Sequence, residues 1–190
     1  MKPEELVLYS GATKGAESEF GAQAERHGIQ EVNFTFEGHP NARGRGIHEL
    51  NREELLKGDV SLTYVSRLLN RNYVHKGETF RKVLQTLFHI VNHSRELFVI
   101  GDILDDGTVR GGTGWGAEFA KLCNKTLYVF DQRQNSWFQW MGEGWQTLSG
   151  ETLPVIREYH FGGTGTRQLQ ENGRQAIEDL FTRSLTQLPN

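Results

Sequence analysis

The fold is decided by three linked segments, VIGD (99–102), RGGTGWGAE (110–118) and LYVFD (127–131). They predict a strand, a glycine-rich loop that opens a helix, and a second strand. Glycine lets the loop backbone adopt positive φ and approach a ligand closely. A helix that begins on such a loop directs free N–H groups and the positive end of its dipole at that ligand, which is most often a phosphate. The segments therefore predict a phosphate cradle, with the Glu118 carboxylate on the first turn of the helix beside it.

Apolar runs and helical periodicity alternate along the rest of the chain. Strands are expected at 5–10, 31–36, 96–103, 126–131 and 155–161, helices at 16–27, 53–70, 78–92, 115–122 and 168–184, and a hairpin over 136–148. Gly58 is a possible break within 53–70. Alternating strands and helices predict an α/β, Rossmann-like three-layer sandwich with a mostly parallel sheet and an added β-hairpin. The length of 190 residues predicts one domain over residues 1–190. With the phosphate cradle described above, we expect it to be a nucleotide-binding domain.

Composition and charge restrict the class of protein. The net charge of −3 argues against a nucleic-acid partner, because nucleic-acid binders usually carry a basic face. No apolar run approaches the roughly 20 residues of a membrane span, so we expect no membrane contact. The start of the chain, MKPEELVLYSG, lacks secretory character, and the single cysteine, Cys123, fits a reducing compartment. We therefore expect a cytoplasmic protein in which Cys123 is a buried thiol.

Three glycine-bearing turns follow predicted strands. They are SGATKGA (10–16), GGTGWG (111–116) and GGTGTR (162–167). If the strands are parallel, all three turns lie on one edge of the sheet, where ligands bind in open α/β sheets. One such turn can reflect tight strand-to-helix geometry alone, but three of them favour a ligand site. They match neither the GxGxxG dinucleotide fingerprint nor the GxxxxGK[ST] phosphate loop, which argues against a hydride-transfer enzyme and a Walker-type NTPase.

The order of these parts resembles the SLOG superfamily of Rossmann-like proteins. SGATKG is similar to its Ser-Gly-Gly-x-x-Gly loop, and GGTGWGAE to its Gly-Gly-x-Gly-Thr-x-x-Glu loop, over residues 6–131. The superfamily includes cytokinin-activating phosphoribohydrolases, molybdenum-cofactor carriers, the DNA-processing protein DprA and nucleotide-sensing domains. The resemblance implies that Gly111, Gly112 and Gly114 hold a phosphate and that Glu118 stands at the position of the catalytic glutamate. Two residues depart from the pattern, Trp115 in place of Thr and Arg110 in place of Pro, and Trp115 argues against hydrolysis more than against binding.

The candidate site residues lie on or beside the three turns. As catalytic groups we expect Glu118, whose carboxylate would stabilise an oxocarbenium-like transition state, and Asp102, which would bind a ribose hydroxyl or support Glu118. Each has a simpler interpretation, since a helix dipole favours Glu in a first turn and Asp often caps loops. The ligand-binding candidates are Ser10, Gly11, Lys14, Gly15, Arg110, Gly111, Gly112, Thr113, Gly114, Trp115, Gly163, Thr164, Gly165, Thr166 and Arg167.

Other features leave alternatives open. The segment RLLNRNYVHKG (67–77) is either a lid that stacks a base or a solvated helix end. His89 and His93 lie four residues apart without an evident acidic partner, so no metal site is expected, and no separate cofactor is implied. Trp137, Trp140 and Trp145 on the predicted hairpin pack on the domain flank or mark a partner surface.

The first hypothesis is that the chain binds a nucleotide or nucleotide-derived small molecule without turnover. The alternative is an N-glycosidic hydrolase (phosphoribohydrolase) of nucleoside 5′-monophosphates that uses Glu118. A weaker alternative is a DNA-associated protein similar to DprA, which the acidic balance disfavours. By resemblance, we also expect a homo-oligomer.

Overall fold

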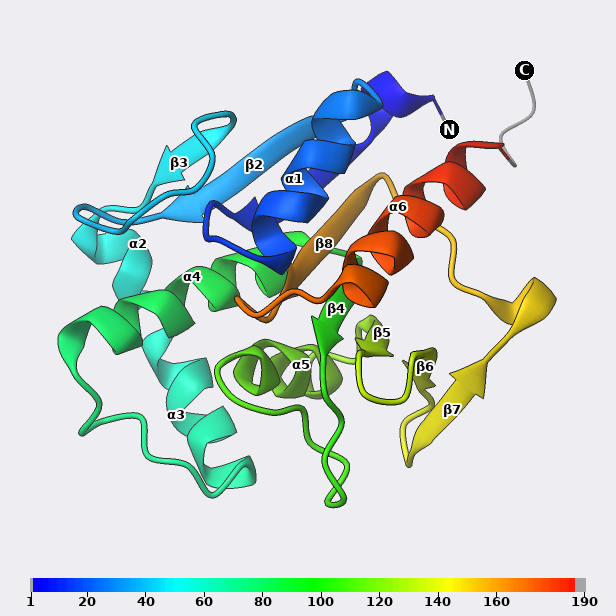
Figure 1. The fold of residues 1–190 in the computed structure, drawn as a ribbon. Helices are drawn as coiled ribbons and strands as arrows, with labels where there is room; N and C mark the ends of the chain where they lie inside the picture. Colours follow the sequence, from blue (N-terminus) through cyan, green and yellow to red (C-terminus); the bar gives the residue numbers. More distant parts are fainter. Residues whose placement is uncertain (1, 187–190) are drawn as a thin grey trace.

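The computed structural model describes residues 2–186, which form one α/β sheet-and-helix unit (Figure 1). The strands are β1 (Val7–Gly11), β2 (Gln30–Thr35), β3 (Ile47–Glu49), β4 (Glu96–Gly101), β5 (Thr126–Asp131), β6 (Ser136–Trp140), β7 (Trp145–Leu148) and β8 (His160–Gly165). The helices are α1 (Ala16–Arg26), α2 (Arg52–Leu56), α3 (Asp59–Leu68), α4 (Glu78–His93), α5 (Thr113–Leu122) and α6 (Glu171–Thr186). Single 3-10 turns, η1 and η2, lie at Pro3–Glu5 and Gly150–Thr152.

All eight strands join one sheet in the order β3-β2-β1-β8-β4-β5-β6-β7. The pairs from β3 to β5 are parallel, and the β6–β7 hairpin extends the sheet with antiparallel pairs. The predicted fold class, a Rossmann-like sandwich with a mostly parallel sheet and an added hairpin, is therefore confirmed. The break at Gly58 is confirmed as well, because α2 and α3 are separate helices.

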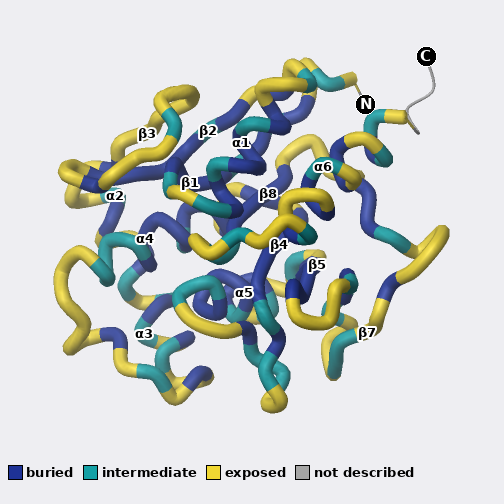
Figure 2. The backbone as a smooth tube through the Cα atoms, in the orientation of Figure 1, coloured by how far each residue is buried: buried dark blue, intermediate teal, exposed yellow. Residues whose placement is uncertain are grey.

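Helices cover both faces of the sheet. One face packs against α1 and α6, and the other against α4 and α5, with α3 resting on α4 and α5 (Figures 1 and 2). Successive residues of a strand point to opposite faces. In β4, Leu97 and Val99 accordingly belong to the core under α4 and α5, while Phe98 and Ile100 belong to the core under α1 and α6. Burial on both faces explains why the central strands read as continuous apolar runs.

The last strand differs from the prediction. The sequence predicts a strand over 155–161 that ends before a glycine loop, but β8 spans His160–Gly165 and contains the glycines itself. A Cβ atom on Gly163 would lie 2.5 Å from the Phe20 ring, and one on Gly162 would lie 2.5 Å from the Leu97 and Ser94 side chains. Glycine is needed here because the neighbouring side chains occupy the space of a Cβ. The third predicted loop therefore shortens to the residues after Gly165.

Strand order places three strand ends together at one edge of the sheet. From β1 the chain continues outward through α1 to β2, and from β4 it continues in the other direction through α5 to β5. β8 lies between β1 and β4 and leads into α6. Where strand order reverses, the carboxyl ends of the strands leave a crevice for ligands. The predicted common edge of the three segments is confirmed.

Two smaller features complete the description. Cys123 is exposed at the end of α5, so the prediction of a buried thiol is wrong. None of the helices described is long and apolar enough to cross a membrane.

Candidate functional site

A cavity of about 620 Å³ opens at the carboxyl edge of β1, β8 and β4. Its lining comes from both helical layers, because α4 and the N-terminus of α5 meet the start of α1 and the segment before α6 there. The lining residues are Thr13, Glu17, Thr79, Phe80, Val83, Thr86, Leu87, Gly101, Asp102, Arg110, Gly111, Gly112, Thr113, Gln132, Thr164, Gly165, Thr166, Arg167, Gln168 and Gln170. A small-molecule site typically has a volume of about 300–1,000 Å³.

The N-terminus of α5 forms one wall of the cavity. Gly111 has a φ of 69°, a conformation that favours glycine, and turns the chain into the helix. The N–H groups of Gly114 and Trp115 donate to the carbonyls of Gly111 and Gly112. Within residues 2–186, no acceptor is found for the N–H groups of Gly111, Gly112 and Thr113. The positive end of the α5 dipole therefore offers the cavity three successive free donors.

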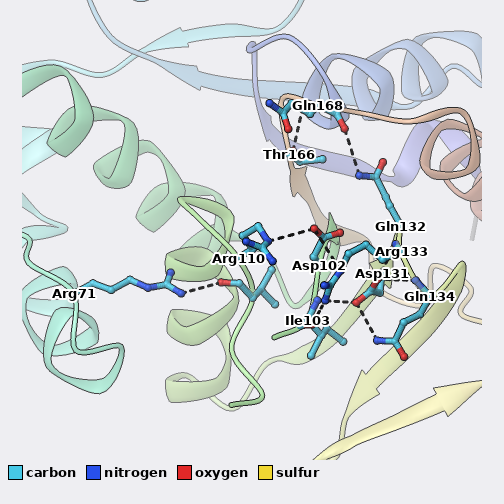
Figure 3. Close-up of polar contacts among 11 residues, drawn as sticks. Arg71, Asp102, Ile103, Arg110, Asp131, Gln132, Arg133, Gln134, Thr166 and Gln168 are labelled. Carbon is cyan, nitrogen blue, oxygen red and sulfur yellow. Dashed lines mark hydrogen bonds and ion pairs between the residues drawn. The ribbon is translucent and has the colours of Figure 1, made fainter. Parts of the chain in front are cut away.

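Arg71 binds the backbone carbonyls of the glycine loop that precedes α5. Its guanidinium donates to the Gly111 carbonyl at 2.9 Å and to the Val109 carbonyl at 3.4 Å (Figure 3). The close approach depends on Gly114, where a Cβ would lie 2.0 Å from the Val109 oxygen and 2.9 Å from the Arg71 guanidinium. The segment 67–77 is largely a solvated helix end, because most of its residues are exposed after α3 ends at Leu68. Tyr73 is buried against Asp59 and does not face the cavity as a stacking lid would, while Arg71 binds the glycine loop.

Asp102, which lines the cavity, forms ion pairs with Arg110 and Arg133. The Nε atom of Arg110 lies 3.4 Å from Asp102 Oδ2, and that of Arg133 lies 3.7 Å from the same oxygen (Figure 3). Both guanidiniums are more than half exposed, which leaves most of their N–H groups available. Asp105 and Asp106 lie beside the same two arginines, so this rim combines carboxylates and guanidiniums.

Asp131 fixes the backbone that carries Asp102. Its carboxylate accepts hydrogen bonds from the backbone N–H groups of Ile103 at 2.8 Å and of Arg133 and Gln134 at 2.9 Å (Figure 3). Burial raises the pKa of Asp131, but these hydrogen bonds outweigh it and hold the pKa below its ordinary value. The predicted strand LYVFD (127–131) therefore does not line the cavity, and Asp131 acts on the site by fixing the backbone next to Asp102.

Glu17 lies in the floor of the cavity on the first turn of α1. One carboxylate oxygen accepts hydrogen bonds from the Thr13 hydroxyl and backbone N–H, and the other accepts from the Thr164 hydroxyl at 2.9 Å. Burial raises the pKa of Glu17, although these hydrogen bonds and the Arg167 charge oppose the rise. The carboxylate joins the loop after β1 to the end of β8.

The segment after β8 closes the far side. The Thr166 carbonyl accepts a hydrogen bond from the Ala16 N–H at 3.0 Å, so this segment lies directly against the start of α1. Gln132 bridges it to β5, since its amide donates to the Gln168 carbonyl (Figure 3). The Gln132 amide oxygen also accepts from the Gln170 N–H. Arg167 lies on this segment and lines the cavity.

The remaining wall belongs to α4. Phe80, Val83 and Leu87 recur at helical spacing on the side of α4 that faces the cavity, and Thr79 and Thr86 lie beside them. This wall is mainly apolar, whereas the walls formed by the α5 N-terminus and by the segment after β8 are polar. The cavity can therefore hold a ligand with one flat apolar part and one anionic part.

The structure brings about half of the predicted residues to the cavity. Those on its surface are Asp102, Arg110, Gly111, Gly112, Thr113, Thr164, Gly165, Thr166 and Arg167. Ser10 instead donates to the Gly163 carbonyl inside the sheet, Gly163 faces Phe20, and Trp115 is buried in the core beside Tyr73. The others that do not line the cavity are Gly11, Lys14, Gly15, Gly114 and Glu118.

Glu118 is the most consequential of these placements. Its carboxylate pairs with Lys121 at 3.2 Å, and the Lys121 ammonium lies over the Trp140 and Trp145 rings of the hairpin. The acidic group on the cavity side comes instead from Glu17. Sequence reasoning passed over Glu17 although it stands two residues after Gly15, as Glu118 stands two after Gly116. The apolar wall of α4 carries no sequence signal beyond ordinary helical periodicity.

No group of three or more His, Cys, Asp or Glu side chains in residues 2–186 is arranged to hold a metal ion. In comparisons of the whole chain, no protein-family model, no curated protein and no solved structure matches it.

Proposed function

We propose that this protein binds a nucleotide or a nucleotide-derived small molecule in the cavity at the carboxyl edge of the sheet. The observation that carries the proposal is the α5 N-terminus, where Gly111, Gly112 and Thr113 line the cavity together with Arg110 and Arg167, and their N–H groups have no acceptor in the described chain. Backbone donors at a helix N-terminus together with guanidinium groups favour a phosphate ligand.

The two helix N-termini at the cavity differ, and the difference supports one orientation of the ligand. At the start of α1 the Ala16 N–H already donates to the Thr166 carbonyl, and the Glu17 carboxylate already accepts from the Thr13 N–H just before the helix. The N-terminus of α5 has no such internal partner in the described chain. We therefore place the phosphate on Gly111–Thr113 and the apolar base against Phe80, Val83 and Leu87, because α5 and α4 adjoin each other.

Isothermal titration calorimetry with AMP, ADP, cyclic AMP and ADP-ribose tests this proposal, with adenosine as the phosphate-free comparison. We expect binding of at least one phosphorylated compound and at least a tenfold weaker affinity for adenosine. Binding also raises the thermal midpoint, since a ligand at 100 times its Kd contributes about 2.7 kcal/mol of stability. If none of the phosphorylated compounds binds, the proposal fails.

Paired arginine variants locate the site. Arg167→Gln removes a cation that lines the cavity, whereas Arg95→Gln removes an exposed cation outside its lining. We expect the first variant to weaken binding about tenfold and the second to leave it unchanged. Equal losses in both variants would indicate nonspecific attraction of an anion.

Hydrolysis of a nucleoside 5′-monophosphate stays a prediction without a structural observation in its favour, because Glu118 pairs with Lys121 away from the cavity lining. Release of free adenine from AMP measures it. Activity that survives Glu118→Ala but is lost in Glu17→Gln would assign the chemistry to the carboxylate in the floor of the cavity.

A further inference from the structure

The Glu17 side chain lines the cavity although it is almost completely buried. Only 7% of its surface is exposed. Buried carboxylates are usually paired with a cation, but the hydrogen-bond partners of Glu17 in the described chain are uncharged. They are the hydroxyl groups of Thr13 and Thr164 and the backbone N–H of Thr13. Glu17 is therefore an acidic group at the cavity that no ion pair within residues 2–186 employs.

The hydrogen bonds of Glu17 leave one acceptor position open. Its Oε2 atom accepts from both the hydroxyl and the backbone N–H of Thr13, whereas its Oε1 atom accepts from the Thr164 hydroxyl alone. A carboxylate has about four acceptor positions, two on each oxygen. The Oε1 atom can therefore take one more hydrogen bond, and a ligand in the cavity can supply it.

Gly11 provides the space that the carboxyl group occupies. It is the last residue of β1, and a Cβ atom there would overlap the Glu17 carboxylate. Gly11 is not among the glycines with positive φ, so the backbone conformation alone does not require glycine at this position. A larger side chain at position 11 would displace the carboxyl group. The first glycine turn thus contributes to the cavity through Glu17, although Gly11 itself does not line it.

The carboxyl group is close to the positions proposed for the phosphate and the base. It is hydrogen-bonded to Thr164 of β8, which pairs with Val99 of β4. Neighbouring strands are about 4.8 Å apart. From β4 the chain leads into the glycine loop of Gly111–Thr113 in the same cavity. The sugar of a nucleotide joins its phosphate to its base, so we expect the sugar over the floor of the cavity, where Glu17 lies.

We propose that the Glu17 carboxyl group binds a sugar hydroxyl of the ligand, so that the cavity prefers ribonucleotides to deoxyribonucleotides. This inference rests on the proposed function. Burial raises the pKa of Glu17 and thereby favours its neutral form. A hydroxyl group both donates and accepts hydrogen bonds and suits either form of the carboxyl group, whereas the amino group of a base only donates. A sugar hydroxyl is thus the better partner.

Calorimetry with AMP, 2′-deoxy-AMP, 3′-deoxy-AMP and IMP tests the proposal. We expect the wild-type protein to bind AMP and to bind at least one of the two deoxy compounds about tenfold more weakly, because a buried polar group is left without its partner. IMP lacks the amino group of adenine but keeps both sugar hydroxyls, so its affinity should be close to that of AMP.

Two variants assign the preference to Glu17. Glu17→Ala removes the carboxyl group, and Gly11→Ala keeps it but displaces it. In both variants AMP and the deoxy compounds should bind with similar affinity. A role of Glu17 in holding the fold alone would weaken all four compounds alike and leave their ratio unchanged. Glu143→Ala is the matched control, because it removes an exposed carboxylate outside the cavity lining and should keep the preference for AMP.

Several results would overturn the inference. Equal affinities of the wild-type protein for AMP and both deoxy compounds would do so while the proposed function stands. A loss of affinity confined to IMP would show that the base amino group, and not the sugar, is recognised. A preference for AMP that survives in both Glu17→Ala and Gly11→Ala would exclude Glu17 as its source. Failure of AMP to bind also overturns the inference, and the other phosphorylated compounds then decide the proposed function separately.

Discussion

Glu96 offers a quantitative test of the energetics of the fold. It begins β4 with 1% of its surface exposed, and its carboxylate accepts hydrogen bonds from the N–H groups of Arg157 at 2.7 Å and Glu158 at 3.0 Å. Burial raises its pKa from 4.5 to about 7, against the opposing effect of these two hydrogen bonds. The folded state therefore binds a proton more tightly than the unfolded state between these two pH values.

The sign of the pH dependence follows from linkage. Stability from the protonated Glu96 carboxyl is fully present below pH 4.5 and is lost as the pH rises through about 7. The difference between the two pKa values corresponds to about 3 kcal/mol, because one pKa unit equals about 1.36 kcal/mol. Glu96→Gln removes the titration and keeps an amide oxygen for the two N–H donors.

Urea unfolding at pH 5, 6, 7 and 8 measures the effect as the difference in the free energy of unfolding between variant and wild type. We expect this difference to grow in favour of Glu96→Gln by roughly 2–3 kcal/mol between pH 5 and pH 8. Glu143→Gln, at an exposed carboxylate of the hairpin turn, should show no such trend. A difference between Glu96→Gln and wild type that is constant from pH 5 to 8 would refute the reasoning.

Three further predictions concern the glycine loop and the thiol. Arg71→Ala should weaken binding of a phosphorylated ligand about tenfold in calorimetry and lower the thermal midpoint by several degrees, because the loop carbonyls lose a charged donor; an unchanged affinity would contradict this positioning role. Gly114→Ala should lower the free energy of unfolding by at least about 2 kcal/mol, since its Cβ would lie 2.0 Å from a backbone oxygen, and urea unfolding measures the loss. Cys123 should react with a thiol reagent in the folded protein because it is exposed. Partial burial raises the pKa of the Cys123 thiol, so its reaction rate should keep rising at pH values above the pKa of an ordinary cysteine. A thiol that reacts only after unfolding would contradict the structure.

Local pattern was sufficient to predict the class of the fold. The apolar runs of β4 and β5 and the periodicity of α4 each identify an element without tertiary information. The predicted strand over 155–161 ends before the glycines of β8, because glycine is unfavourable in strands. Gly162 and Gly163 are needed because Phe20, Leu97 and Ser94, which are distant in sequence, occupy the space of a Cβ atom. No local pattern reports that contact.

In the candidate site, too, a local motif predicts some of the residues and tertiary packing decides the others. The backbone donors of Gly111–Thr113 follow from a local motif, so sequence reasoning found them. The apolar wall from α4 and the amide bridge of Gln132 depend on how helices are placed over the sheet edge, which the sequence does not state. Glu118 was assigned by resemblance, but its direction depends on Lys121 and the tryptophans of the hairpin, and these turn the carboxylate away from the cavity.

The position of β8 has a consequence for how the chain reaches its native state. β8 is the last strand in the sequence, yet it separates β1 from β4 in the middle of the sheet. Until residues 160–165 have left the ribosome, the β1–β3 and β4–β7 parts have no strand between them, and each exposes an unpaired edge. Such edges can pair with other chains and aggregate. Since its partners are distant in sequence, insertion of β8 should be a slow, late step in folding, and a chain that ends before residue 160 should be prone to misassembly.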